Sequence, residues 1–558
     1  MALALWLVAP VLGDPTGLAL GHPENDVWNH LWGYWYVADA LGRGELPLQT
    51  ELLRWPSGGS LWFIDTFDAL LTLPVQAALG TVAAYNAAVF LNFVLAGVGA
   101  YALALSVTRS WAGALFAGLA FEATPQLLGQ AYNGITETLA VGWLPLAILA
   151  WRSALATPTP ARGLLAGAAL GVAAVANWYY GLFAAMAVGG LLLREAWRLR
   201  PGQKRRRKKK LPLPTLVAAG VGLLLVVGGP LYLFRSSISA ADALVSRDPA
   251  FVWSTLVLHN MVDVLALVHP GKFYSPDLEA IFGEHLIVVV YLGWALVLPA
   301  LAALALPRTR PWAALALGFL VLTLGPFLYV NGDYLQVAGG WVPLPFLALF
   351  EGIPIFARLA HAYRFGIAAT LALCVMAAWL VAGVEERRGA RAALAAALVL
   401  AGARVGESLY GSAARFPLPT SEVEVPAPCA QLEGGAVWDL PLGVPVLARS
   451  RYGLCQLAHG QPSPYALNEP VPAALWANRF SRYLIELEWS TVASLPPSMP
   501  WLDLELGRQA LVADGLRWIV LHEDRFNEHG YLRMARFLDL VAEPAFEADG
   551  LRVYRLDP

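Results

Sequence analysis

The run AAYNAAVFLNFVLAGVGAYALAL, residues 83–105, contains no charged side chain. It exceeds the ~20 residues that an α-helix needs to cross a bilayer. The same character extends over the chain, because 58% of its 558 residues are hydrophobic and only 14% are charged. In a soluble protein about a quarter of the residues are charged. We therefore expect a polytopic α-helical membrane protein.

Other apolar runs bring the predicted number of membrane helices to about 11. The first run is the weakest, because it also has the apolar core of a signal peptide, although it lacks a basic segment before that core. Residues 65–80 would break the alternation of inner and outer loops, so we expect them to be interfacial or re-entrant. The predicted helices cover residues 1–13, 82–106, 111–128, 137–151, 163–177, 179–193, 213–234, 285–306, 312–330, 363–383 and 392–410.

Lysine and arginine gather in every second loop, most densely in KRRRKKK, residues 204–210. Loops rich in these residues remain cytoplasmic, so we predict a cytoplasmic N-terminus and an external C-terminus. KRRRKKK also fits a nucleic-acid or nuclear-localisation patch. Between two membrane helices, however, such a segment is more typical of a topology determinant that faces anionic lipid. The net charge of −2 gives no support for a nucleic-acid partner.

Three glycines in GLLAGAALG, namely Gly163, Gly167 and Gly171, are four residues apart. This spacing places them on one face of a helix, where they let a neighbouring helix approach closely. We interpret the motif as a packing surface.

The composition changes after Tyr410, where prolines, charges and short alternating segments replace the long apolar runs. GAVWDLPL (435–442) and GLRWIVLHED (515–524) are typical of buried strands, and Asp549-Gly550 is typical of a hairpin turn. Helical spacing recurs near 474–490, 503–514 and 527–541. The predicted organisation is a membrane domain over residues 1–410 and an external α/β domain over 411–558.

The three cysteines exclude a disulfide scaffold and a multi-cysteine zinc site. Cys374 falls within a predicted membrane helix and is interpreted as an apolar filler. Cys429 and Cys455 flank the strand AVWDLPL in the external part, where thiols oxidise. We expect either a bridge between them or two separate buried thiols.

The predicted first external loop, residues 14–68, opens with GHPENDVWNHLW, residues 21–32. It combines acids and histidines with tryptophans. Tryptophan and tyrosine at a membrane surface form an interfacial belt, which is one interpretation of the aromatic residues. A belt needs no carboxylates, however, so the acids and histidines indicate a site.

The chain resembles the GT-C class of membrane glycosyltransferases and, more closely, the YfhO-like group of bacterial membrane proteins. The matching segments are ENDVWNHLWGYWYV, AAYNAAVFLNFVLAGVGAYALAL, NWYYGLF, IPIFARLAHAYRF, VWDLPL and GLRWIVLHED. This resemblance implies chemistry on a polyprenyl-phosphate-linked sugar at the outer leaflet. It places the acidic motif of the family at Glu24-Asn25-Asp26, with Asp26 as the principal carboxylate and Glu24 in support.

Glycosyl transfer needs one group that deprotonates the acceptor hydroxyl and another that stabilises the departing phosphate. Glu24 and Asp26 could alternatively converge on a divalent metal ion. For the phosphate we select Arg358, His361 and Arg364, whose spacing would make one face of a helical turn cationic, although headgroup anchoring is an alternative. Further candidates are His22 and His30 beside the acids, Glu122 and Glu137 facing the same cavity, and more weakly His259, His269, Glu284 and His285.

These residues predict a glycosyltransferase of the bacterial inner membrane. It would move a sugar from a polyprenyl-phosphate-linked donor to a cell-envelope glycan, lipid or protein acceptor at the outer face. A non-catalytic protein that binds the lipid carrier is the main alternative. A transporter is less well supported, because no internal repeat is evident and the acids gather outside the membrane.

Overall fold

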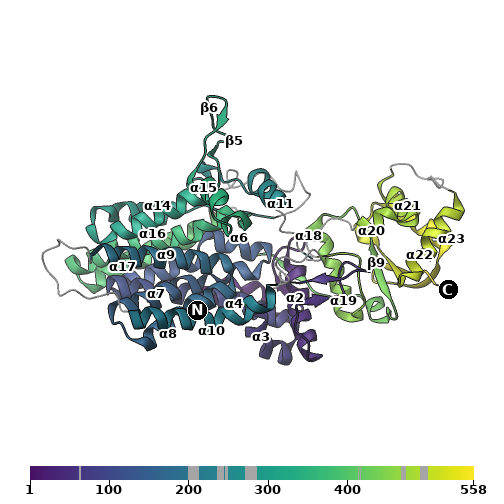
Figure 1. The fold of residues 1–558 in the computed structure, drawn as a ribbon, viewed down its shortest axis with the longest axis horizontal. Helices are drawn as coiled ribbons and strands as arrows, with labels where there is room; N and C mark the ends of the chain where they lie inside the picture. Colours follow the sequence, from purple (N-terminus) through teal and green to yellow (C-terminus); the bar gives the residue numbers. More distant parts are fainter. Residues whose placement is uncertain are drawn as a thin grey trace.

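The computed structural model describes residues 1–61, 65–198, 213–235, 244, 249–270, 286–412, 414, 416–466, 473–490 and 500–557. KRRRKKK, Glu284 and His285 lie outside these residues. The described residues form a bundle of helices with a C-terminal region at one end of it (Figure 1). We use the name C-terminal region for residues 416–557.

Five stretches in the described part of the chain are long and apolar enough to cross a membrane. They are Thr81–Thr108, Thr136–Ala156, Leu213–Phe234, Ala362–Arg388 and Ala390–Tyr410. They confirm the predictions at 82–106, 137–151, 213–234, 363–383 and 392–410, whereas the total of about 11 stays a prediction. The bundle comprises α4 (Thr81–Thr108), α5 (Trp111–Glu122), α7 (Trp143–Ala156), α8 (Pro160–Ala176), α9 (Trp178–Arg198), α10 (Leu213–Phe234), α13 (Trp294–Ala302), α14 (Arg310–Thr323), α16 (Gly366–Arg388) and α17 (Ala390–Tyr410).

The N-terminal run differs from its prediction. Here α1 covers only Ala2–Leu7 and is followed by the short 3-10 helix η1 (Ala9–Val11). A helix of this length rises about 9 Å, and Pro10, which lacks a backbone N–H, follows it. A membrane helix over residues 1–13 is therefore wrong for this structure. Strand β1 (Leu18–Leu20) follows and pairs with β8 (Thr420–Glu422), which fastens the C-terminal region to the bundle.

The glycine motif packs α8 against α10. A Cβ atom on Gly163 would lie 2.1 Å from the carbonyl oxygen of Thr215, and one on Gly167 would lie 1.8 Å from that of Ala219. No side chain fits such gaps, so the glycines allow the two backbones to touch. The packing interpretation of the motif is confirmed.

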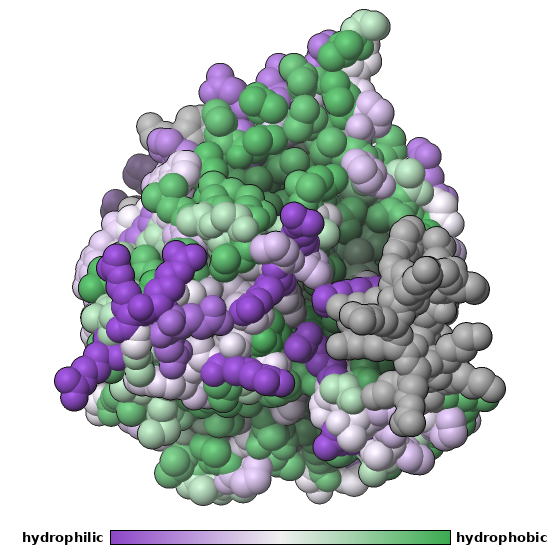
Figure 2. Space-filling view, turned by 90° about the vertical axis from the view of Figure 1, so that its left-hand side faces the viewer, coloured by the Kyte–Doolittle hydropathy of each residue, from purple (hydrophilic) through white to green (hydrophobic). Residues whose placement is uncertain are grey.

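The two ends of the bundle have different character. At one end Arg308 pairs with Glu386 at 3.1 Å, and the hydroxyl of Ser110 donates to Glu385. Figure 2 shows hydrophilic residues gathered on this end, which lies opposite the C-terminal region. The other end carries α2 (Val27–Gly42), α3 (Thr66–Leu79) and α6 (Pro125–Asn133). Helix α3 has 14 residues and is too short to span a bilayer upright, in agreement with the prediction for 65–80.

The C-terminal region contains a four-stranded sheet in the order β11-β12-β10-β9. The two predicted strands, β9 (Ala436–Leu440) and β10 (Leu516–His522), are confirmed and run parallel. The hairpin of β11 (Glu543–Ala548) and β12 (Leu551–Arg555) is confirmed too, with Asp549 and Gly550 at φ 53° and 73°. The accompanying helices include α18 (Val446–Arg449), α19 (Gly453–His459), α20 (Ala473–Ala477), α21 (Arg479–Trp489), α22 (Trp501–Ala513) and α23 (Glu528–Val541).

Cys429 and Cys455 form a disulfide, with 5.2 Å between their α-carbons. This confirms the predicted bridge. It ties the start of the C-terminal region to α19, and Cys374 is buried within α16 as expected.

The hydrophilic end of the bundle, at Arg308 and Ser110, lies opposite the C-terminal region, and this placement gives a topology prediction. We predict that a reporter active only outside the cytoplasm is active when fused after Asp557. The same reporter should be silent when inserted at Gly389, in the turn between α16 and α17 at the hydrophilic end. Activity at Gly389 with silence after Asp557 would reverse the orientation.

Candidate active site

The stretch that contains Asp26 leads directly into α2. Asp26 is the residue before this helix, is 5% exposed, and accepts a hydrogen bond from Asn29 Nδ2 at 2.6 Å. Trp28 and Trp32 are buried, and Trp28 Nε1 donates to the carbonyl oxygen of Pro23. These tryptophans therefore pack inside the protein and do not form an interfacial belt.

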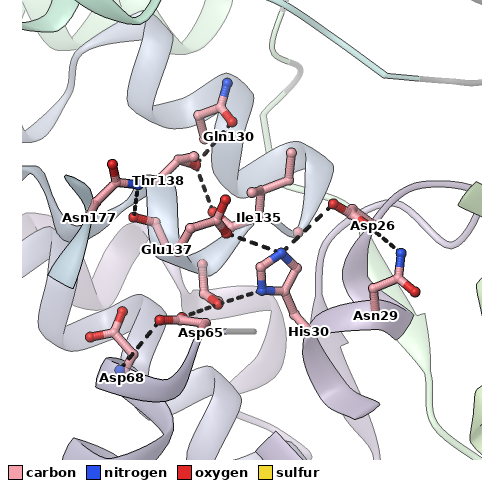
Figure 3. Close-up of polar contacts among 12 residues, drawn as sticks. Asp26, Asn29, His30, Asp65, Asp68, Gln130, Ile135, Glu137, Thr138 and Asn177 are labelled. Carbon is pink, nitrogen blue, oxygen red and sulfur yellow. Dashed lines mark hydrogen bonds and ion pairs between the residues drawn. The ribbon is translucent and has the colours of Figure 1, made fainter. Parts of the chain in front are cut away.

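His30, one turn after Asp26, lies at the centre of a carboxylate cluster (Figure 3). Its Nε2 is 3.2 Å from Glu137 Oε2 and 3.8 Å from Asp26 Oδ2. On the other side of the ring, Nδ1 is 3.0 Å from the hydroxyl oxygen of Thr136. His30 thus joins α2 to the segment after α6.

The Thr136 hydroxyl determines which atom donates in its contact with this histidine. The hydroxyl has one hydrogen and donates it to Asp65 Oδ2 at 2.6 Å. It therefore accepts the hydrogen of His30 Nδ1. The geometry thus places the ring between Asp65, which it reaches through Thr136, and the pair Glu137 and Asp26, which Nε2 faces.

Two further acids extend the cluster along α3. Asp65 precedes this helix and accepts hydrogen bonds from the Asp68 backbone N–H and from the Tyr34 hydroxyl. Burial raises the pKa of Asp65, and the nearby charge of His30 opposes that rise. Asp68 is also buried and accepts from Asn92 Nδ2 at 2.6 Å.

Arg364 supplies a cation on the far side of Glu137. It lies in the 3-10 helix η10 (Ala362–Phe365) that precedes α16 and is 9% exposed. Its guanidinium lies over the Tyr179 ring at 4.9 Å, and its charge acts on Glu137. Among the described residues its Nε has no hydrogen-bond partner. Arg364 lines a cavity of about 10 Å³ with Gln126, Gln130, Thr138, Tyr180 and three apolar residues.

The predicted cationic face is wrong. Residues 359–361 separate η9 (Phe356–Arg358) from η10, so Arg358, His361 and Arg364 do not share a continuous helix. Arg358 is exposed. His361 lies near Arg364, because both contact Tyr179, and its Nδ1 is 3.0 Å from Asn260 Nδ2.

The predicted acids separate as well. Glu24 pairs with Arg525 of the C-terminal region at 3.2 Å, so its carboxylate does not converge with that of Asp26. Glu122 packs against Gly97, in the middle of α4, whereas Glu137 contacts His30. A shared cavity for Glu122 and Glu137 stays a prediction. In the described ranges no group of three or more His, Cys, Asp or Glu side chains is placed to hold a metal ion, and no step below depends on one.

Asp26 and Arg364 are linked less directly than expected. Asp26 is buried in the cluster, but it does not line the cavity at Arg364, and Glu137 and His30 mediate between them. Sequence reasoning gave no role to Asp65, Asp68 or Thr136. Asp65 and Asp68 show the pattern of a helix start, with one acid at the N-cap and a second acid three residues later. This pattern predicts a helix and does not indicate a functional site.

Comparison with known proteins shows the fold. No family model and no curated protein matches the chain. The arabinofuranosyltransferase AftD from Mycobacteria matches with a TM-score of 0.57 and 12% identity, over 100% of this chain and 39% of that chain. ArnT from Cupriavidus metallidurans bound to undecaprenyl phosphate matches with a TM-score of 0.46 and 15% identity, over 99% of this chain and 96% of that one. The Archaeoglobus fulgidus oligosaccharyltransferase tethered with an acceptor peptide gives 0.44 and 12%, over 100% and 73%.

The likeness to AftD shows a shared fold alone, and this chain spans about two fifths of that protein's length. The TM-scores of 0.46 and 0.44 are too low to support a shared fold. The predicted fold of a membrane glycosyltransferase agrees with the likeness to AftD, and the YfhO-like relationship stays a prediction.

The contacts of His30 can be tested by His30→Gln, which keeps a donor for Thr136 but removes the ring nitrogen beside Glu137 and Asp26. Leaving a buried polar group without its partner typically costs about 1–3 kcal/mol. We therefore expect the purified variant to unfold at a clearly lower temperature than the wild type. The exposed His529 on α23 gives the matched control His529→Gln, which should unfold like the wild type. Equal unfolding of all three proteins would contradict the joining role of His30.

Proposed function

We propose that this chain is a membrane glycosyltransferase that moves a sugar from a polyprenyl-phosphate-linked donor to an acceptor at the outer face of the membrane. One observation carries the proposal. A buried guanidinium with an unpartnered Nε, that of Arg364, lies beside a buried carboxylate–histidine cluster among the described residues. These are the two kinds of group that glycosyl transfer from a phosphate needs.

Arg364 is the proposed phosphate ligand. A guanidinium matches the geometry of phosphate oxygens and stabilises the charge that develops as the phosphate leaves. The present cavity holds about one water molecule. Binding of a lipid phosphate therefore requires neighbouring side chains such as Gln126 and Gln130 to move aside. His361, which also contacts Tyr179, is the proposed second ligand.

Asp26 is the proposed general base. The acceptor hydroxyl loses its proton to the Asp26 carboxylate while its oxygen forms a bond to the anomeric carbon of the donor sugar. The bond from that carbon to the phosphate oxygen breaks, and the lipid phosphate departs with the bonding electrons. His30 Nε2 lies 3.8 Å from the Asp26 carboxylate, and Asp65 orients His30 through Thr136.

A protein that only binds the lipid carrier is the rival function. Arg364 alone would serve that function. A cluster of acids behind it would then only lower the stability of the folded protein, because buried carboxylates are destabilising unless they are paired. The structure maintains Asp26, Asp65, Asp68 and Glu137 at this end of the bundle (Figure 3). Their presence favours catalysis over simple binding.

The proposal predicts different defects for its two principal residues. Asp26→Asn keeps the shape of the side chain but removes its basicity, so sugar transfer should fall about 10²–10⁴-fold while donor binding persists. Arg364→Gln should weaken binding of the lipid-linked donor as well as transfer. The assay uses purified protein with a panel of polyprenyl-phosphate hexoses and pentoses.

Asp39, on the helix α2 that Asp26 precedes but paired with Arg43 at the surface, gives the matched control Asp39→Asn. This variant should transfer sugar like the wild type. Full activity of Asp26→Asn would remove Asp26 as the base. A wild type that binds the lipid donor but transfers no sugar to any acceptor would favour the rival function.

A further inference from the structure

A second polar pocket lies between α2 and the C-terminal region. Helix α2 contributes Asn29 and Trp32, and the C-terminal region contributes Asp439, Arg449 and Tyr452, with Tyr465 beside them. The cavity volume is about 30 Å³, larger than that at Arg364. The charged residues that line it, Asp439 and Arg449, are more than 400 residues away along the chain from Asn29 and Trp32.

The pocket contains buried charges. Asp439 is 2% exposed and Arg449 is 5% exposed. Asp439 Oδ1 lies 2.7 Å from His522 Nε2, and the His522 ring packs on Tyr452 with 4.4 Å between ring centroids. The Arg449 guanidinium lies over the Tyr465 ring at 5.0 Å. Asp439 is thus paired with His522, and its carboxylate and the Arg449 guanidinium line one cavity together with Asn29. Convergent polar groups around a cavity are typical of a ligand site.

Asn29 connects this pocket to the proposed base. It lines the pocket, and its Nδ2 donates to Asp26 Oδ1 at 2.6 Å. Figure 3 shows the two side chains facing one another from the start of α2. A ligand held in the pocket is therefore one residue away from Asp26, on the other side of Asp26 from Glu137 (Figure 3).

The two walls of the pocket are fixed to each other. Trp32 Nε1 donates to Gln456 Oε1 at 2.6 Å, and the Arg54 backbone N–H donates to the carbonyl oxygen of Tyr465 at 2.8 Å. Glu24 pairs with Arg525 at the edge of the same junction. The junction thus holds Asp439 and Arg449 at a constant position relative to α2.

The lining identifies the chemistry of the ligand. Carboxylate, guanidinium and amide groups together accept hydrogen bonds from neighbouring hydroxyls and donate to them. The volume suits about two water-sized groups, such as a hydroxyl and a hydroxymethyl at one edge of a ring. The charged lining offers no apolar channel for a lipid chain.

We propose that this pocket binds the terminal sugar of a carbohydrate acceptor and directs one of its hydroxyls past Asn29 to Asp26. The inference rests on the proposed function for its role as an acceptor site. Donor and acceptor then approach the cluster from opposite sides, the donor phosphate at Arg364 and the acceptor sugar at Asp439 and Arg449.

The test measures glycan binding separately from transfer. The full chain, purified in detergent, is applied to an array of bacterial cell-envelope glycans and defined disaccharides immobilised through their reducing ends. We expect the wild type to bind a subset of these glycans. Asp439→Asn and Arg449→Gln should each weaken that binding at least tenfold, and Ala466→Leu, which fills the pocket without removing a charge, should do the same.

Two controls separate the pocket from the rest of the protein. Arg536→Gln, an exposed change on α23, should bind like the wild type. Arg364→Gln should also bind glycans like the wild type although it loses transfer. An unchanged melting temperature and an intact Cys429–Cys455 disulfide establish that each variant is folded.

The outcomes are distinct. Absence of glycan binding by the wild type, or binding by folded Ala466→Leu that equals the wild type, overturns the pocket. Glycan binding that depends on the pocket, in a wild type that transfers no sugar from any lipid donor, supports the pocket and overturns the proposed glycosyltransferase.

Discussion

The ring of His30 lies between carboxylates from three separate segments, and the candidate site depends on this contact. Its Nε2 faces Glu137 and Asp26, and its Nδ1 reaches Asp65 through Thr136. The ring therefore joins α2, the start of α3 and the segment after α6, and it does so where the bundle meets the C-terminal region.

The neighbouring contacts keep that meeting point rigid. The Asn133 side chain accepts from the Ile287 backbone N–H at 2.9 Å and donates to the Ile287 carbonyl at 2.7 Å, and its oxygen also accepts from Asn25. Buried Arg404 of α17 donates to the carbonyl oxygen of Leu292 at 2.6 Å. These bonds fix an extended segment of the chain beside the cluster. The backbone beside the cluster is therefore held in place, while side chains such as Gln126 and Gln130 move to admit the lipid phosphate.

The sequence predicts the helices and strands better than it predicts which side chains contact one another between them. Hydropathy predicts helices such as α4 and α16 because lipid requires a continuous apolar run, and alternation with turn residues predicts β9, β10 and the hairpin at Asp549-Gly550. Hydropathy fails at residues 1–13, where it predicts a membrane helix but a proline follows a single short helix. The contacts of His30 with Glu137 and, through Thr136, with Asp65 depend on tertiary packing. The spacing of these residues along the chain does not predict them. The regular spacing of Arg358, His361 and Arg364 misled for the same reason, since the backbone leaves the helix between them.

In the proposed function, Arg364 receives the phosphate of a polyprenyl carrier. Cross-linking with a polyprenyl phosphate that carries a photoactivatable group close to its phosphate, followed by peptide mass spectrometry, tests this contact. We expect labelling of the peptides that line the Arg364 cavity, around Gln126 to Thr138 and around Tyr363 to Ile367, and loss of that labelling in Arg364→Gln. Labelling confined to lipid-facing surfaces such as α10, and equal in the wild type and Arg364→Gln, would contradict it.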